Sequence, residues 1–62
     1  MDLQLKLLDE LTKSNNLLTN LQKQLSKTSD FAERCDIHTV IEKEIIRNET
    51  LIEIYNLSEG NN

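Results

Sequence analysis

Apolar residues in the first half of the chain recur at steps of three, four and seven positions. This spacing is typical of an α-helix that packs against a partner along one row of residues, which we call the seam. The seam of this segment comprises Leu7, Leu11, Leu18, Leu21 and Leu25. Ser14 takes a seam position where an apolar residue is expected, so the row has a polar interruption. Because no proline breaks the pattern, it predicts a helix over about residues 3–27.

The second half of the chain carries a similar row. Its seam comprises His38, Ile41, Ile45, Asn48, Ile52 and Tyr55, with Ile37 and Leu51 on its flanks. Asn48 is again a polar residue in an apolar row. The pattern predicts a second helix over about 31–57. A frayed tail at 58–62 follows, in which Gly60 serves as the C-cap.

Turn-favouring residues cluster between the two rows, at 26–30. Asp30 followed by Glu33 resembles a capping box. In that arrangement Asp30 accepts hydrogen bonds from the first amides of the second helix, and Glu33 reaches back. We therefore place the turn at 28–30.

One turn between two helices predicts a single all-α domain over residues 1–62, an antiparallel two-helix hairpin with coiled-coil-like packing. A register centred near residue 31 would bring Ser14 and Asn48 into one polar layer, where each satisfies the other's buried polar group. The cap at Asp30 favours a centre nearer residue 29, which shifts the pairing by about one turn. The pattern is compatible with both registers.

Several apolar residues are not used by either seam. They are Leu5 on the first helix and Val40, Ile46, Ile54 and Leu57 on the second. A helix that is apolar on two sides is normally buried on two sides. We therefore predict that these residues bind a partner, either another protein or a second copy that completes the core of the hairpin.

Length and charge narrow the function further. A chain of 62 residues buries only about 60% of its unfolded surface and has little room for an active-site cleft. The net charge of −4 is the wrong sign for a protein that neutralises phosphates. It divides into +1 over residues 1–27 (four basic, three acidic) and −5 over 28–62 (three basic, eight acidic). The expectation is a non-enzymatic protein-binding module without a cofactor, and not a nucleic-acid-binding protein.

Cys35, His38 and Glu42 lie on one side of the second predicted helix with a spacing that suits zinc ligands. A structural zinc site needs four ligands, and the chain has no other Cys or His, so a dimer would have to supply two pairs. We expect no metal site, with His38 on the seam and Cys35 as a small apolar residue. Cys35 and His38 also lack the orienting group and oxyanion hole of a nucleophilic site.

The location of the protein follows from its cysteine content and hydropathy. A single cysteine forms no disulfide within the chain, so a reducing cytoplasm is the default. The N-terminus lacks the basic and apolar regions of a signal peptide. No apolar run approaches the roughly 20 residues that cross a bilayer. We expect a cytoplasmic protein without a membrane span.

The layout resembles the YscE-like helical-hairpin co-chaperones of type III secretion needle assembly. The resemblance covers most of the chain: a leucine-rich first helix, a short polar turn at 27–30 and a long second helix. The residues that carry it are Leu17, Leu18, Leu21, Leu25, Ile45, Ile46, Ile52, Ile54 and Tyr55. It implies a cytoplasmic protein that supports a helical-repeat chaperone, which in turn holds the needle subunit unpolymerised.

Two other small hairpins offer alternative functions. The chain is similar in length and single turn to the plasmid copy-number hairpin, which dimerises into a four-helix bundle and binds paired RNA loops. That similarity implies an RNA-binding homodimer whose contacts would depend on Lys6, Lys13 and Lys23. A smaller likeness to the sporulation-type aspartyl-phosphate phosphatases implies a phosphatase-type regulatory hairpin, without a counterpart here of their S-Q-E-L-D signature.

Overall fold

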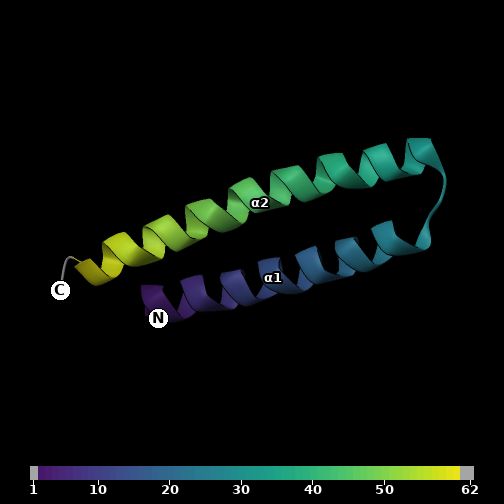
Figure 1. The fold of residues 1–62 in the computed structure, drawn as a ribbon. Helices are drawn as coiled ribbons and strands as arrows, with labels where there is room; N and C mark the ends of the chain where they lie inside the picture. The colour runs from purple at the N-terminus through teal and green to yellow at the C-terminus, as the bar shows by residue number, and fades with distance from the viewer. Residues whose placement is uncertain (1, 61–62) are drawn as a thin grey trace.

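Two antiparallel α-helices form the whole of the described structure, a computed structural model in which residues 2–60 are described. Helix α1 spans Leu3–Lys27 and helix α2 spans Phe31–Gly60. They lie side by side along their lengths and are joined by one short turn, so the start of α1 and the end of α2 lie at the same end of the molecule (Figure 1). The residues described contain no strand. The predicted all-α hairpin is confirmed.

The ends of α1 agree with the sequence pattern, and the end of α2 extends past it. Asp2 is the N-cap of α1, and its carboxylate accepts a hydrogen bond from the backbone amide of Gln4 at 3.0 Å. Helix α2 continues to Gly60, past the predicted end at about 57, and residues 61–62 of the predicted tail at 58–62 lie outside the described part. The half-buried Ser58 continues the row of residues that faces α1, which gives this last turn a packing surface.

The turn is held by an arginine from α2. One guanidinium nitrogen of Arg34 donates to the backbone carbonyls of Leu25 at 2.8 Å and Thr28 at 3.0 Å. It thereby satisfies carbonyl groups at the C-terminal end of α1 that have no partner within the helix. The predicted role of Glu33 is wrong: instead of reaching back to Asp30, its carboxylate accepts from the hydroxyl of Thr28 at 3.1 Å.

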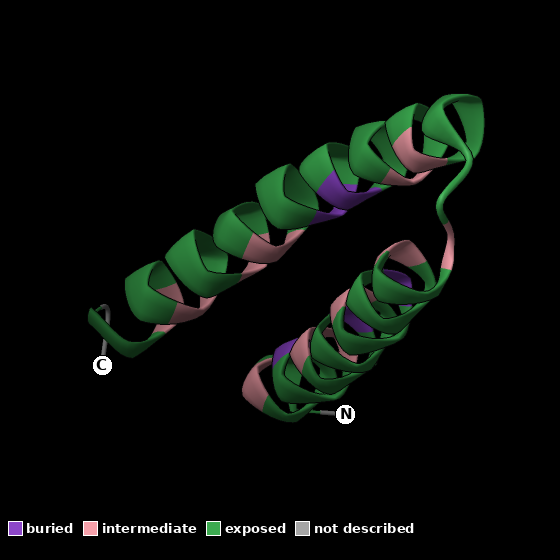
Figure 2. Cartoon of the chain, turned by 45° about the vertical axis from the view of Figure 1, so that its right-hand side comes forward, coloured by how far each residue is buried: buried purple, intermediate pink, exposed green. Residues whose placement is uncertain are grey.

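The interface between the helices follows a regular heptad spacing on both sides. On α1 the inward row is Gln4, Leu7, Leu11, Ser14, Leu18, Leu21, Leu25 and, just beyond the helix, Thr28. On α2 the inward row is Arg34, Ile37, Ile41, Glu44, Asn48, Leu51, Tyr55 and Ser58. These residues are buried or half-buried, and they form one continuous stripe on each helix that faces the other (Figure 2).

The predicted seam of α1 agrees with this interface, whereas the seam of α2 is rotated. Ile41, Asn48 and Tyr55 lie in the interface as predicted. His38, Ile45 and Ile52 are exposed, so their assignment to the seam is wrong. The positions one residue earlier, Ile37, Glu44 and Leu51, are the ones that face α1. The rotation puts Glu44 inside, where it meets polar partners, and turns two isoleucines outward.

Candidate functional site

A cluster of polar side chains occupies the middle of the interface. Ser14 is fully buried, and its hydroxyl donates to a carboxylate oxygen of Glu44 at 2.6 Å. The side-chain amide of Asn48 donates to the Ser14 oxygen at 3.0 Å and to the Asn15 carbonyl oxygen at 2.8 Å. Ser14 therefore lies between two residues that are one turn apart on α2. The bond between Ser14 and Asn48 corresponds to a register centred near residue 31, and the shorter bond between Ser14 and Glu44 corresponds to one centred near residue 29, so Ser14 lies between the two predicted registers.

An ion-pair chain leads from this cluster to the surface. One nitrogen of Arg47 donates to Glu44 at 2.9 Å and another donates to Glu10 on α1, also at 2.9 Å. Lys13 adds a pair with Asp9 at 3.1 Å and a longer contact with Glu10 at 3.8 Å. The charge of Glu44 is thus neutralised within the cluster, which is the usual condition for burying a carboxylate.

The pKa values respond to these contacts. The hydrogen bond from Ser14 holds the pKa of Glu44 below its ordinary value, and Arg47 adds to this against the opposing effect of burial. Glu44 in turn raises the pKa of Arg47, with a smaller contribution from Glu10. The neighbouring Asp9 raises the pKa of Lys13. All three shifts favour the charged forms, so the cluster stays ionised at neutral pH.

The chemistry of the cluster is structural. Within residues 2–60, every buried side-chain nitrogen or oxygen has a hydrogen-bond partner. The Ser14 hydroxyl, one carboxylate oxygen of Glu44 and the amide nitrogen of Asn48 are therefore bonded to one another or to neighbouring residues. A polar layer of this kind fixes the register of two packed helices, because sliding by one turn would leave buried polar groups unpaired.

The ion pair between Glu10 and Arg47 also shows which sides of the two helices face the same way. Heptad spacing places Glu10 in a row with Leu3 and Leu17, and Arg47 in a row with Val40 and Ile54. Since Glu10 and Arg47 touch, these two rows lie together on one side of the hairpin. We call this side the ion-pair flank; it comprises Leu3, Glu10, Leu17, Val40, Arg47 and Ile54.

The opposite side of the hairpin carries little charge and a group of exposed apolar side chains among uncharged polar ones. On α1 this side has two neighbouring rows. The row next to the interface contains Leu8, Asn15 and Gln22, and the row further from α2 contains Leu5, Thr12 and Thr19. Its row on α2 contains Phe31, His38, Ile45 and Ile52, and ends at Glu59 in the last turn. We call this side the apolar flank. Its large apolar side chains are Leu5, Leu8, Phe31, Ile45 and Ile52, all of them exposed.

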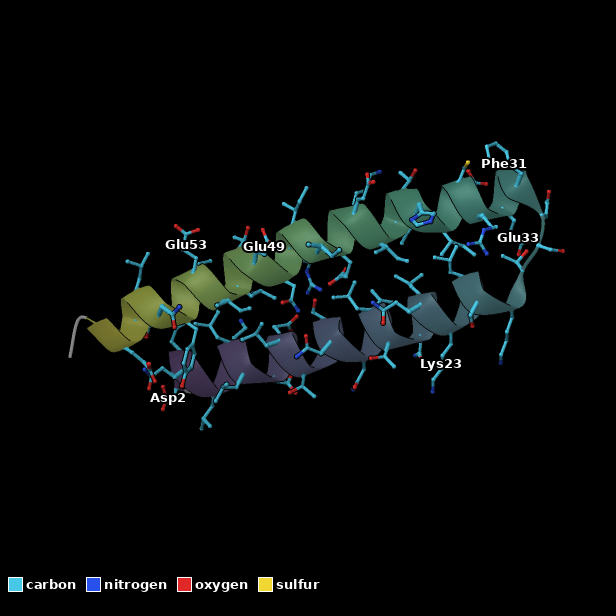
Figure 3. All side chains as sticks on the ribbon, viewed as in Figure 1. Asp2, Lys23, Phe31, Glu33, Glu49 and Glu53 are labelled. Atoms are coloured by element: carbon cyan, nitrogen blue, oxygen red, sulfur yellow. The ribbon has the colours of Figure 1, made fainter. Side chains whose placement is uncertain are left out.

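The predicted partner-binding residues are all exposed, but they do not form one surface. Val40 and Ile54 belong to the ion-pair flank, and Leu57 lies outward from Ile54. Ile46 precedes Glu53 by two helical turns and so shares its direction, away from α1 (Figure 3). Leu5 lies on the apolar flank. Val40, Ile54 and Leu57 therefore lie on or beside the ion-pair flank, Ile46 faces away from α1, and Leu5 lies on the opposite side.

The sequence reasoning missed most of the apolar flank. Phe31, which is 79% exposed, and Leu8 were not singled out for partner binding, and Ile45 and Ile52 were assigned to the seam. The available signal was the strict seven-residue spacing of Phe31, His38, Ile45 and Ile52, which marks one row of a helix. Whether that row faces inward or outward depends on the position of Glu44 relative to Ser14.

The candidate chemical groups are dispersed on the surface. Cys35 and His38 are exposed near the start of α2. In the described part of the chain, no three His, Cys, Asp or Glu side chains come together as a metal site. Lys13 is engaged with Asp9, and Lys23 points away from α2 (Figure 3). Lys6 and Lys13 are seven residues apart on one row, and Lys23 lies outside that row.

The surface of the hairpin has an open hollow at the turn, and its helices are not of the membrane-spanning kind in the part that the structure describes. An open hollow of about 500 Å³ lies at the turn and is lined by Gln24, Lys27, Thr28, Ser29, Asp30 and Glu33. Over residues 2–60, neither helix has a stretch long and apolar enough to cross a membrane. Comparison of the chain with protein-family models, with curated proteins and with solved structures found no match.

Proposed function

We propose that this chain is a non-enzymatic protein–protein interaction module whose core is completed by another protein chain. The observation that carries the proposal is the imbalance between buried and exposed apolar residues. Among the described residues only Leu7, Leu21 and Ile41 form a buried apolar core, whereas eleven large apolar side chains are exposed. The exposed set includes the predicted residues Leu5, Val40, Ile46, Ile54 and Leu57 together with the apolar flank.

The physical basis is the small size of the hairpin. Each fully buried apolar side chain contributes about 1.5–3 kcal/mol relative to an exposed one. Three such residues and a polar layer leave most of the apolar surface of two long helices exposed to water. Covering part of the exposed set would supply the missing burial. The adaptor or co-chaperone role that the YscE-like resemblance implies is one form of this function.

The compartment we propose is the cytoplasm. Cys35 is an exposed, free cysteine. A single exposed thiol suits a reducing environment, where it does not form disulfides with other chains.

Site-specific photocrosslinking in the native cell tests the function. A photoreactive phenylalanine analogue at Phe31 should form a covalent adduct with a protein, because this exposed side chain lies on the apolar flank. The same analogue at Lys23, which points outward on α1, is the matched control and should form little adduct. Equal labelling at both positions, or no protein adduct at Phe31 or at a second site, Ile46, would contradict the proposal.

A further inference from the structure

We propose that the apolar flank is the docking surface for a second copy of this chain, and that the two hairpins stack into an antiparallel four-helix bundle. This inference rests on the proposed function and names its partner. It concerns one side of the hairpin only, the side with Leu5, Leu8, Phe31, Ile45 and Ile52. Stacking there would convert each two-helix interface into a four-helix core.

Exposed apolar side chains from both helices contribute to this flank. Phe31, Ile45 and Ile52 share one row of α2, and Leu5 and Leu8 lie near the start of α1. Because the helices are antiparallel, Leu8 and Ile52 lie toward one end of the hairpin and Phe31 lies toward the turn. The apolar groups therefore gather in the half of the flank away from the turn, where they would pack in the core of a bundle, and Phe31 adds one apolar group at the turn.

The two flanks differ in charge. The described α1 rows of the apolar flank contain Leu, Thr, Asn, Gln and Ser but no charged residue. The row of α2 on the same flank, which runs from Phe31 to Glu59, has no Lys or Arg, and Glu42 and Glu49 lie along its outer border. On the ion-pair flank, by contrast, Glu10 and Arg47 are already paired with each other, and Lys13 beside the flank also contacts Glu10. Burying those charges against a second chain would cost their hydration, so the apolar flank is the less costly interface.

The borders of the flank also decide how the two copies are oriented. A twofold axis parallel to the helices places α2 of one copy on α1 of the other, so that Glu42 and Glu49 face the neutral border with Thr12 and Thr19. A twofold axis across the helices instead places α2 on α2, and the acidic borders of both copies meet. Like charges at a border oppose association. The first arrangement, with both turns at the same end, is therefore the one we infer.

The area of one flank suits a dimer interface. The hairpin measures 48 × 15 × 14 Å, so one long face covers about 700 Å². A stable interface of standard size buries about 800 Å² on each partner. One flank of this small protein thus provides roughly the area that a specific dimer needs, and both flanks are not required.

Two isoleucines on α2 provide a matched pair for the test. Ile52 on the apolar flank is 44% exposed and Ile54 on the ion-pair flank is 42% exposed. Sedimentation equilibrium of the full chain should show a dimer for the parent protein. Ile52→Glu should weaken dimerisation at least tenfold, and Ile54→Glu should change the dissociation constant less than threefold. Circular dichroism at high concentration checks that both variants remain helical, and Phe31→Ser provides a second apolar-flank variant.

Sedimentation of the variants and photocrosslinking at Phe31 together distinguish a second copy of this chain from a different protein partner. Two results would overturn the second-copy proposal. One is a parent chain that stays monomeric at about 500 µM. The other is a dimer that is weakened by Ile54→Glu but not by Ile52→Glu or Phe31→Ser. If the Phe31 photocrosslinker then captures a different protein, the interaction function stands and only its partner changes. An adduct of two copies of this chain supports both.

The orientation has its own readout. A spin label on the native Cys35 reports the distance between copies. Cys35 lies about ten residues, or about 15 Å at 1.5 Å per residue, from the middle of α2. In the arrangement with the twofold axis across the helices, the two labels lie on opposite sides of that middle, so they are separated by about 30 Å along the bundle. With both turns at one end, that axial separation vanishes and a distance of about 20 Å is expected across helices spaced 8–10 Å apart. A distance near or above 30 Å overturns the same-end arrangement.

Discussion

Ser14 and Glu44 show how two polar residues come to lie in an interface built from leucine and isoleucine. The hydroxyl of Ser14 bonds to Glu44 and accepts from Asn48, while Arg47 neutralises the carboxylate from the solvent side. A small side chain at position 14 leaves room for the longer Glu44 to lie across the interface. Neither residue is stable there alone, because each would be a buried polar group without a partner.

Replacing Ser14 by alanine should destabilise the hairpin by about 1–3 kcal/mol, because Glu44 loses its closest donor and Asn48 loses an acceptor. Urea unfolding followed by circular dichroism measures the change. Ser26→Ala is the matched control: its hydroxyl donates to the carbonyl of Lys23 at an exposed position, and its removal should cost less than about 0.5 kcal/mol. Equal losses in the two variants would contradict the role of the polar layer.

The stability of the hairpin should fall at acidic pH through Glu44. Its pKa in the folded state lies below the ordinary value of 4.5, chiefly because Ser14 donates to it. A lowered folded-state pKa stabilises the fold above the unfolded value, and this stabilisation is lost as the pH falls through the folded pKa. Urea midpoints measured from neutral pH to about pH 3 should therefore decline below about pH 4.5.

Glu44→Gln should flatten that acid decline, since the amide does not titrate. Glu49→Gln, at an exposed position that points away from α1, is the control and should leave the decline unchanged (Figure 3). The assignment to Glu44 fails if the two variants have the same acid profile.

At the scale of the elements, the turn depends on Arg34 more than on the capping box that its sequence resembles. Arg34 bonds to two carbonyls at the end of α1, and Glu33 bonds to Thr28. The Arg34 side chain of α2 thereby satisfies free backbone carbonyl groups at the C-terminal end of α1. Capping-box spacing is a local signal, whereas a contact nine residues back along the chain forms only after the chain has reversed direction.

Arg34→Met should destabilise the hairpin by about 1–2 kcal/mol, because it keeps the apolar stem and removes both hydrogen bonds. Arg34→Lys should restore part of the loss, since an ammonium group can still donate but lacks the planar fork of the guanidinium. Urea midpoints of the three proteins give the order. A midpoint of Arg34→Met equal to that of the parent chain would exclude this capping role.

The rotation of α2 has a similar origin. Counting apolar residues favours the row His38, Ile45 and Ile52, because isoleucine is a better core residue than glutamate. The structure selects the neighbouring row because Glu44 there reaches Ser14 and Arg47. The helix boundaries and the α1 row could be predicted, since they depend on local propensity and periodicity. The facing of α2 could not, because it depends on which residues of the other helix lie opposite.

At the scale of the whole molecule, the long thin hairpin has two flanks of different character. The ion-pair flank carries charges that are already matched, and the apolar flank carries Phe31, Ile45 and Ile52 in one row. A molecule of this shape has no interior apart from its single helix–helix interface. Its folding and its association should therefore be coupled.

Coupled folding and association make the melting temperature depend on concentration. Thermal unfolding by circular dichroism between about 5 and 500 µM should show a midpoint that rises with chain concentration, because association stabilises only the folded form. Ile52→Glu should remove most of this dependence, and Ile54→Glu should retain it. A midpoint that stays constant for the parent chain over the whole range would show that the hairpin folds without association.

The sequence by itself determined that the protein is a two-helix hairpin. It determined the extent of α1, the beginning of α2 and the inward row of α1, because propensity, the absence of proline and heptad spacing act within each segment. Only the tertiary structure decided the facing of α2, the capping of α1 by Arg34 and the separation of the exposed apolar residues into different flanks. These features depend on contacts between residues up to 37 positions apart, and such contacts exist only once both helices are in place.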